Sequence, residues 1–321
     1  MDNFTHTLTG LVLSRAGLNR ISPHATLLLL VAVNAADFDA AAVVAGPAAY
    51  LHFHRGPLHS LVAMPVLALL VVALMRLLLR KQFSWPRAFL VSLIGVASNP
   101  LFDYANTYGL RLLWPFSSQW MYGDFLPILD PWILLLLVGA LVVPWFAGLV
   151  NSDIGAKKGT GRGTAVFVLC VIALYGFGRY LLHNRAVAVL ESRLYQSQVP
   201  LRVGAFPTLV NPFRWTGVVE GRGFFQILPG LNLREEFDPS AGSVYYKPEP
   251  RAEIDKVRDT EVFRSFLEFS QWTLWRVIPN PENGVQVEAL DLRFGTPERP
   301  HFTASAVFDG SGRLLTSALR F

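Results

Sequence analysis

The chain has 321 residues, of which 52% are hydrophobic and only 16% are charged, so it is more apolar than an ordinary soluble domain. Its formal net charge is +5, but the basic residues are scattered or lie in short loops between hydrophobic stretches, which argues against a nucleic-acid-binding protein. The single cysteine, Cys170, excludes an intrachain disulfide and a cysteine-based zinc motif. These features indicate a membrane protein.

The N-terminal part contains two apolar segments, Phe4–Leu18 and Ala25–Ala36, joined by a short basic link. Both are too short to span a bilayer comfortably, because a spanning helix needs about 20 apolar residues. We expect them to form a hairpin that dips into the membrane, in preference to two helices lying on its surface.

Four longer apolar segments follow and approach the length of a membrane span. They are Leu61–Leu79, Arg87–Phe102, Pro131–Val150 and Thr164–Leu182. The second has the weakest hydropathy, because it is short and carries Ser92, Ser98 and Asn99. A polytopic, mainly helical membrane bundle is therefore predicted over residues 1–183.

Basic residues connect these predicted spans in two loops. Arg76, Arg80, Lys81 and Arg87 lie in the first loop, and Lys157, Lys158 and Arg162 lie in the second. Cytoplasmic loops are enriched in Lys and Arg, so both loops are expected to face the cytoplasm. The chain before Leu61, the connection from Asp103 to Asp130 and the chain after Leu182 are then expected outside it.

From Arg185 onward the sequence becomes polar and rich in turn residues. Ala186–Tyr195 is expected to continue the last helix, and Pro200–Pro212 is interpreted as a linker. Apolar and polar residues mix or alternate in four segments that we predict as strands, namely Val218–Ile227, Gly242–Tyr246, Val285–Phe294 and Phe302–Phe308. Helical spacing predicts a helix at Thr260–Trp275. We expect an extracytoplasmic α+β domain over residues 184–321.

Histidines and carboxylates gather at the outer end of the predicted bundle. They include Asp2, His6, Asp37, Asp39, His52, His54, His59 and Asp103. Each has an ordinary explanation when taken singly, because an aspartate often caps a helix and a histidine near a membrane interface is often only a polar rim residue. Together they indicate a functional site, since ionisable groups are costly at membrane depth.

Mixed imidazole and carboxylate groups are typical ligands of zinc, manganese or iron. Arg55 lies among them in the sequence, and a guanidinium group is well suited to bind a phosphate. We therefore predict a divalent metal site, with zinc as the preferred ion.

Several spaced motifs between Met1 and Val150 resemble the YdjM/YbcI family of inner-membrane metal-dependent hydrolases. The motifs are Met1–His6, Asp37–Asp39, His54–Ser60, Leu101–Gly109 and Leu113–Phe116. The resemblance implies an inner-membrane location and a distant relation to zinc-dependent phospholipase C and single-strand nucleases, which are all-helical phosphoesterases. It also implies metal ligands at His6, Asp37, Asp39, His54, His59 and Asp103.

Two positions depart from the pattern of that family. Ala36 replaces a proline, which affects only a turn, and Asn99 replaces a histidine four residues before Asp103. An amide is a poorer transition-metal ligand than an imidazole. The site is therefore expected to bind fewer ions, to recruit a neighbour such as His52, or to be degenerate.

The function expected from these features is hydrolysis of a phosphoester or lipid head group at the outer face of the inner membrane. Asp37 or Asp39 would act as general base and Arg55 would bind the phosphate. Membrane lipid is the expected partner, and no nucleic acid is expected. The alternative is a non-catalytic scaffold or binding protein with a structural or degenerate metal site. A transporter is disfavoured, because transporter sites lie near the bilayer midplane.

Overall fold

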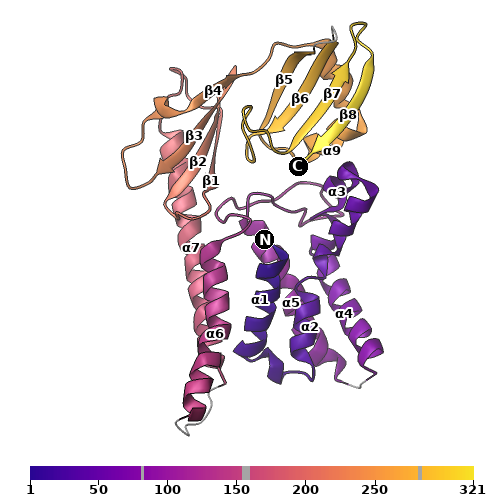
Figure 1. Ribbon diagram of the computed structural model, residues 1–321, viewed down its shortest axis with the longest axis vertical. Helices are drawn as coiled ribbons and strands as arrows, with labels where there is room; N and C mark the ends of the chain where they lie inside the picture. Colours follow the sequence, from indigo (N-terminus) through magenta and orange to yellow (C-terminus); the bar gives the residue numbers. More distant parts are fainter. Residues whose placement is uncertain (81–82, 154–159, 281–283) are drawn as a thin grey trace. The chain divides into compact units, whose positions relative to one another are not determined.

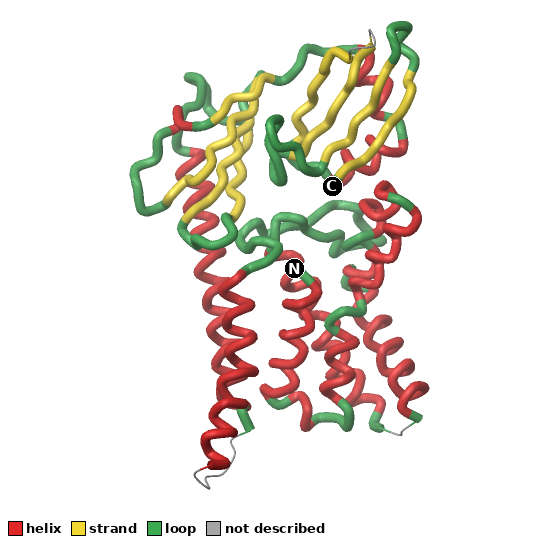
Figure 2. The backbone as a smooth tube through the Cα atoms, viewed as in Figure 1, coloured by secondary structure: helices red, strands yellow, loops and turns green. Residues whose placement is uncertain are grey.

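The structure is a computed structural model that describes residues 1–80, 83–153, 160–280 and 284–321 (Figure 1). The chain divides into two compact units. The first comprises Met1–Asp39, Arg55–His183 and Pro207–Pro212, and the second comprises Ala40–His54, Asn184–Phe206 and Phe213–Phe321. Figure 2 shows that helices dominate the first unit and that the strands form two sheets of the second.

The first unit is a bundle of helices connected by short turns and 3-10 helices (Figure 1). Its elements are α1 (Asn3–Ala16), η1 (Leu18–Arg20), α2 (Ala25–Ala32), the start of η2 (Ala36–Ala45), η3 (Pro57–His59), α4 (Ala63–Leu79), α5 (Trp85–Ala105), α6 (Pro131–Asp153) and most of α7 (Arg162–Glu191). Asp2 caps α1 by accepting a 2.9 Å hydrogen bond from the backbone N–H of Thr5. The predicted helical N-terminal region is thus confirmed.

Two apolar cores hold this bundle together. One joins α2, α4 and α5, and the other joins α1, α6 and α7. The close approach of α2 and α5 depends on Gly95, where an added Cβ would lie 2.8 Å from the Cβ of Ala32. One turn later on α5, Asn99 donates a 3.0 Å hydrogen bond to the carbonyl of Val33. This packing brings the end of α5 next to the start of η2.

Among the described residues, three helices are long and apolar enough to cross a membrane: Trp85–Ala105, Pro131–Leu149 and Arg162–Glu191. The number rises to as many as 5 if each of two bent helix pairs counts as one span. The predicted span Leu61–Leu79 belongs to such a pair, because Pro47–His59 and Ala63–Leu79 meet at an angle of 83°. In the second and third helices only 17% and 22% of the apolar window is buried, as expected of helices that face lipid.

The basic ends of the bundle are described only in part, because Lys81, Lys157 and Lys158 lie outside the described residues. Arg162, at the start of α7, donates a 3.0 Å hydrogen bond from Nε to the carbonyl of Ala16, at the end of α1. The start of α7 and the end of α1 therefore lie at the same end of the bundle.

The second unit contains two four-stranded sheets with the orders β1-β2-β3-β4 and β5-β6-β7-β8. The strands are β1 (Arg202–Pro207), β2 (Arg214–Glu220), β3 (Phe224–Asn232), β4 (Ser243–Tyr246), β5 (Thr273–Asn280), β6 (Gly284–Asp291), β7 (Thr303–Phe308) and β8 (Leu314–Arg320), and the helices are α3 (Pro47–Phe53), η4 (Pro239–Ala241), α8 (Ala252–Arg258) and α9 (Glu261–Phe269). In the first sheet, β3 pairs antiparallel with both β2 and β4. In the second sheet, every neighbouring pair from β5/β6 to β7/β8 is antiparallel. One apolar core, which includes Phe206, Phe225, Trp272 and Leu290, joins the sheets. The predicted α+β character of this region is confirmed.

Three details of the prediction for this unit are wrong. The segment Val218–Ile227 is not one strand, because the chain turns after Gly221 and separates β2 from β3. The helix expected at Thr260–Trp275 ends at Phe269, and Thr273 already begins β5. The segment Pro200–Pro212 contains β1 rather than only a linker. The helical spacing that predicted this helix runs from Val262 to Phe269, whereas Trp272 and Leu274 alternate into the core between the sheets.

Candidate metal centre

A group of buried polar side chains lies at the end of the bundle where α1 and α4 begin. Asp37 comes from the first turn of η2, His59 from the end of η3 and Asp103 from the last turn of α5. All three side chains are buried. Each offers one ligand atom, and these atoms all lie within 4.8 Å of one another. Residues from three distant parts of the chain are thus brought together.

The spacing of the ligand atoms fits a single ion. His59 Nε2 lies 3.4 Å from Asp37 Oδ1 and 3.3 Å from Asp103 Oδ2. Ligands bound at about 2.1 Å around a tetrahedral ion are separated from one another by about 3.4 Å. The distances from the imidazole nitrogen to the two carboxylate oxygens therefore match those between ligands of a zinc-like ion, and the two oxygens lie within 4.8 Å of each other.

His6, on the first turns of α1, adds a fourth candidate ligand. Its ring is completely buried, and its Nε2 lies 3.6 Å from Asp103 Oδ1. Within the described part of the chain, neither ring nitrogen has a hydrogen-bond partner. Buried polar atoms are nearly always paired, because an unpaired one loses its hydration without compensation. A bound cation would satisfy this nitrogen, so the donor set fits a metal ion.

Asp39 lies behind His59 and is not part of the group of three. Its Oδ2 is 3.0 Å from His59 Nδ1 and accepts a 2.9 Å hydrogen bond from the backbone N–H of Arg55. Carboxylates placed in this way orient a metal-binding histidine and make its other nitrogen a better ligand. The geometry therefore suits Asp39 to hold the ring of His59 so that Nε2 faces Asp37 and Asp103.

Arg55 brings a positive charge to the same place. Its Nη2 lies 3.0 Å from Asp103 Oδ1, and its guanidinium stacks 4.8 Å above the ring of Tyr108. The backbone of Arg55 is left-handed, with φ of 56°, a conformation that costs about 1–3 kcal/mol for residues other than glycine. The Asp103 carboxylate also contacts the amino group of Met1. Arg55 thus adopts a costly backbone conformation and places its guanidinium beside the carboxylate of Asp103.

Asn99 occupies the position where the resembling family has a histidine. Its Nδ2 donates a 3.0 Å hydrogen bond to Asp37 Oδ2 and another of 3.0 Å to the carbonyl of Val33. The amide therefore acts as a donor that holds one oxygen of Asp37, while the other oxygen faces His59. It lies at the edge of the centre.

Asn106 contacts the polar cluster, although nothing in the sequence singled it out as a separate candidate. Its Oδ1 accepts hydrogen bonds from Arg55 Nη1 at 2.9 Å and from the backbone N–H groups of Tyr108 at 2.9 Å and Gly109 at 3.3 Å. One amide thus anchors the guanidinium and the turn that follows α5. The only sequence signal was its place inside the motif Leu101–Gly109.

Three other residues of the predicted cluster have different surroundings. His54 belongs to the second unit, where its ring stacks on Tyr50 at 4.6 Å. His52 is exposed, and its Nδ1 lies 3.8 Å from Glu268 Oε2 in the same unit, whereas Asp2 caps α1. The structure therefore brings together His6, Asp37, His59 and Asp103, with Asp39 and Arg55 beside them, and a ligand role for His54 stays a prediction.

Two family models match different parts of the chain. The family described as YdjM inner membrane protein matches residues 1–186, and the YfhP C-terminal alpha/beta plait domain matches residues 252–320, from α8 to β8. A relative in Bacillus subtilis (strain 168), described as uncharacterized protein YfhP, is 27% identical over 158 residues, which is 46% of this chain and 47% of that protein. The chain thus spans about half the length of this relative.

No solved structure matches the chain. The family match covers more than half of the residues and includes every member of the polar cluster in the first unit. Together with the apolar helices, it supports a location in the inner membrane. The chain belongs to the YdjM inner membrane protein family.

Proposed function

We propose that this chain is a metal-dependent hydrolase of the inner membrane that cleaves a phosphoester bond in a lipid head group. The observation that carries the proposal is the convergence of His6, Asp37, His59 and Asp103 in one buried centre. A cation, Arg55, lies 3.0 Å from one of the carboxylates. Imidazole and carboxylate groups can hold a metal ion that activates water, and a guanidinium group can bind a phosphate.

The four residues would hold one divalent ion, with zinc preferred from the ligand types, and water would occupy a fifth position, which zinc can accept. Such an ion lowers the pKa of a bound water toward 7 and stabilises negative charge on phosphoryl oxygens. His59 is kept in position by Asp39, and Asp37 is kept in position by Asn99. These contacts fix the ligand atoms before substrate binds, which reduces the reorganisation needed during the reaction.

Asp37 is the carboxylate that we assign as general base: its Oδ1, which faces His59, would bind the ion, and its Oδ2, which accepts the hydrogen bond from Asn99, would accept the proton. It lines a cavity that opens beside the centre, whereas Asp103 is completely buried and Asp39 faces His59 and the backbone of Arg55. In the proposed reaction the water oxygen bonds to phosphorus while the bond from phosphorus to the leaving oxygen breaks. The proton passes from water to Asp37 and then to the leaving oxygen, and Arg55 neutralises charge on the phosphate.

The orientation in the membrane is part of the proposal. Arg76, Arg80 and Arg87 lie at one end of α4 and α5, and Asp103 lies at the other end of α5. Since basic loops face the cytoplasm, the centre would open toward the outer face and the chain after α7 would be extracytoplasmic. Protease added outside intact spheroplasts should then degrade the residues after Glu191. Degradation only in permeabilised cells would show the opposite orientation.

The enzyme proposal is tested by measuring metal content and hydrolysis together. Wild-type protein purified in detergent should retain a divalent ion by elemental mass spectrometry, and it should hydrolyse phospholipids or lipid phosphates when zinc and manganese are compared. His59→Ala should remove the ion and the activity. Loss of a residue that only orients a ligand already lowers metal affinity about 10–100-fold, and loss of a ligand should cost more. The matched control is His52→Ala, because His52 is exposed and pairs with Glu268.

The non-catalytic alternative is tested by the variant Asn99→His. This change restores the family's usual histidine beside Asp37 and should raise metal occupancy. If the wild type binds metal but neither it nor Asn99→His hydrolyses any phosphoester, the metal is structural and the chain is a scaffold. If neither protein binds metal, the proposed centre is wrong.

A further inference from the structure

A cavity of about 670 Å³ lies directly beside the metal centre in the first unit. Asp37, one of the candidate ligands, forms part of its wall. The remaining wall comes from the start of α1, from α2 and the turn after it, and from η2, η3 and α4. Cavities of this size are typical of sites for small molecules. The cavity therefore touches the candidate centre at Asp37 and extends from there along α4.

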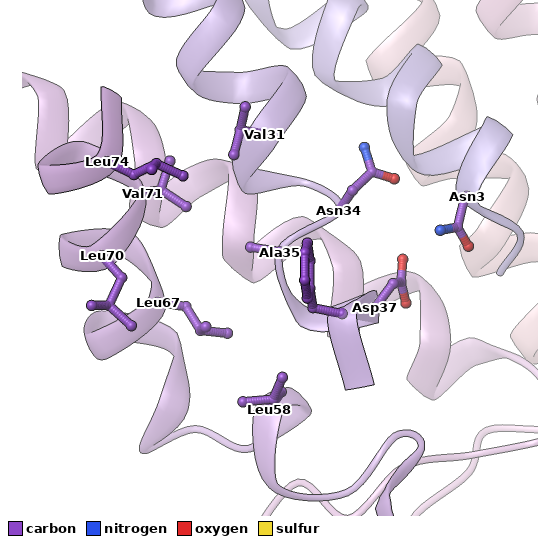
Figure 3. Close-up of a pocket in the computed structure, with 11 residues that line it drawn as sticks. Asn3, Val31, Asn34, Ala35, Asp37, Leu58, Leu67, Leu70, Val71 and Leu74 are labelled. Carbon is purple, nitrogen blue, oxygen red and sulfur yellow. The ribbon is translucent and has the colours of Figure 1, made fainter. Parts of the chain in front are cut away.

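The wall is polar at one end and apolar along the rest. Figure 3 shows Asn3, Asn34 and Asp37 on one side of the cavity and a row of side chains from α4 on the other. That row consists of Leu67, Leu70, Val71 and Leu74. Leu70 and Leu74 are 58% and 45% exposed. The apolar part is thus an open groove on the surface of α4.

The groove lies on a helix that is part of a candidate membrane span. α4 is apolar enough to form a bent candidate span with Pro47–His59, and α2 forms another with η2. In a bilayer, the exposed leucines of the groove would therefore contact lipid hydrocarbon. A peptide would be a poor occupant of the apolar part, because its backbone groups would find few hydrogen-bond partners there.

We propose that this groove binds an acyl chain of the lipid substrate and so places the phosphate of that lipid at the metal centre. The inference rests on the proposed function, which it makes more specific: the substrate is a phosphate-containing lipid that enters sideways from the membrane. The acyl chain lies along Leu67, Leu70 and Leu74. The head group lies at the polar end, beside Asn3, Asn34 and Asp37.

A binding experiment separates this inference from catalysis. The probe is phosphatidylglycerol with a photoreactive diazirine in one acyl chain, in nanodiscs of phosphatidylethanolamine that hold the full-length protein. After irradiation, mass spectrometry of peptides should place the crosslinks mainly on α4 at Leu70 and Leu74. Metal binding is measured on the same samples.

The variant Leu70→Trp fills the groove, and Leu69→Trp is the matched control. Leu69 lies on the same helix and is 49% exposed, but it is not part of the groove wall. We expect Leu70→Trp to reduce crosslinking to Leu74 at least about tenfold, and Leu69→Trp to leave it unchanged. Hydrolysis of long-chain phosphatidylglycerol should fall by a similar factor in Leu70→Trp, while hydrolysis of a water-soluble short-chain phosphoester and metal content should stay at the wild-type level.

Different outcomes contradict different claims. Crosslinks spread equally over Leu69, Leu70 and Leu77, with no effect of Leu70→Trp, would show ordinary boundary lipid and overturn the inference about the groove. Specific crosslinks that respond to Leu70→Trp in a protein without metal or hydrolysis would support the lipid site and overturn the enzyme proposal. Equal losses of long-chain and short-chain hydrolysis in Leu70→Trp would also contradict a role for the groove in acyl-chain recognition.

Discussion

The two units bury charged groups in different ways. In the second unit, the buried pair of Arg293 and Asp291 is fully matched: Nη2 of Arg293 donates to Asp291 Oδ2 at 2.7 Å and to the carbonyl of Phe269 at 3.0 Å. In the first unit, His6 is completely buried, yet its ring nitrogens lack hydrogen-bond partners in the described chain. A satisfied buried pair supports a fold, whereas a buried imidazole without a hydrogen-bond partner among the described residues is suited to bind a ligand.

The largest expected effect comes from removing one partner of the buried pair of Arg293 and Asp291. Asp291→Ala leaves the guanidinium of Arg293 buried without its partner, and breaking such a pair costs about 3–5 kcal/mol. We expect the second unit of the full-length protein to unfold at lower denaturant concentration and to become sensitive to protease. Metal content should not change.

The control for this variant is an exposed pair in the same unit. Asp255 lies 3.9 Å from Arg258 at the surface, and such pairs contribute less than about 1 kcal/mol. Asp255→Ala should therefore leave the unfolding curve nearly unchanged. Equal effects of Asp255→Ala and Asp291→Ala would show that the buried pair has no special role.

A packing change in the first unit should have an intermediate effect. Gly95→Leu places a side chain where Ala32 lies 2.8 Å from the position of a Cβ, and overpacking of this kind costs about 1–3 kcal/mol. Because α2 and α5 carry Val33 and Asn99 into contact, separating these helices should displace Asp37 and reduce metal retention.

Gly139→Leu is the matched control for Gly95→Leu. Gly139 lies in α6, and a Cβ there meets no atom within 4 Å. Thermal unfolding and metal content of Gly139→Leu should match the wild type. If Gly95→Leu behaves in the same way, the close approach of α2 and α5 does not position the centre.

The smallest expected effect distinguishes a ligand from a residue that orients a ligand. Asp39→Asn should lower metal affinity by about tenfold, because outer-shell changes cost about 10–100-fold, whereas Asp37→Asn should cost more. Competition with a chelator of known affinity measures both values. If Asp39→Asn abolishes binding as completely as Asp37→Asn, Asp39 is itself a ligand, as the resemblance to the family implied.

The helical elements were predictable because their signal is local. A run of apolar residues long enough to cross a bilayer is visible in the sequence without knowledge of its neighbours, and α5, α6 and α7 each contain the segment predicted for them. The second unit was harder, because Trp272 and Leu274 follow a helix with suitable spacing and yet alternate into a core formed by distant strands.

For the candidate centre too, the sequence predicted the residue types, and the packing of the helices decided their geometry. The residue types and the charge of the loops placed His6, Asp37, His59 and Asp103 at one end of the bundle. Their distances of 3.3–3.6 Å came only from the packing of α1, η2, η3 and α5. The anchoring role of Asn106 depends on a turn that meets Arg55 from another part of the chain.

The sequence alone thus determined the apolar character of the first unit, the polar character of the second and the chemical types that gather at one end of the bundle. The tertiary structure decided which carboxylates face a histidine nitrogen, that Asp39 lies behind His59, and that a groove on α4 continues from Asp37. The physical reason is the distance along the chain over which each property is set. Hydropathy and helix formation depend on neighbouring residues, whereas ligand geometry depends on close packing between helices that are far apart in the chain.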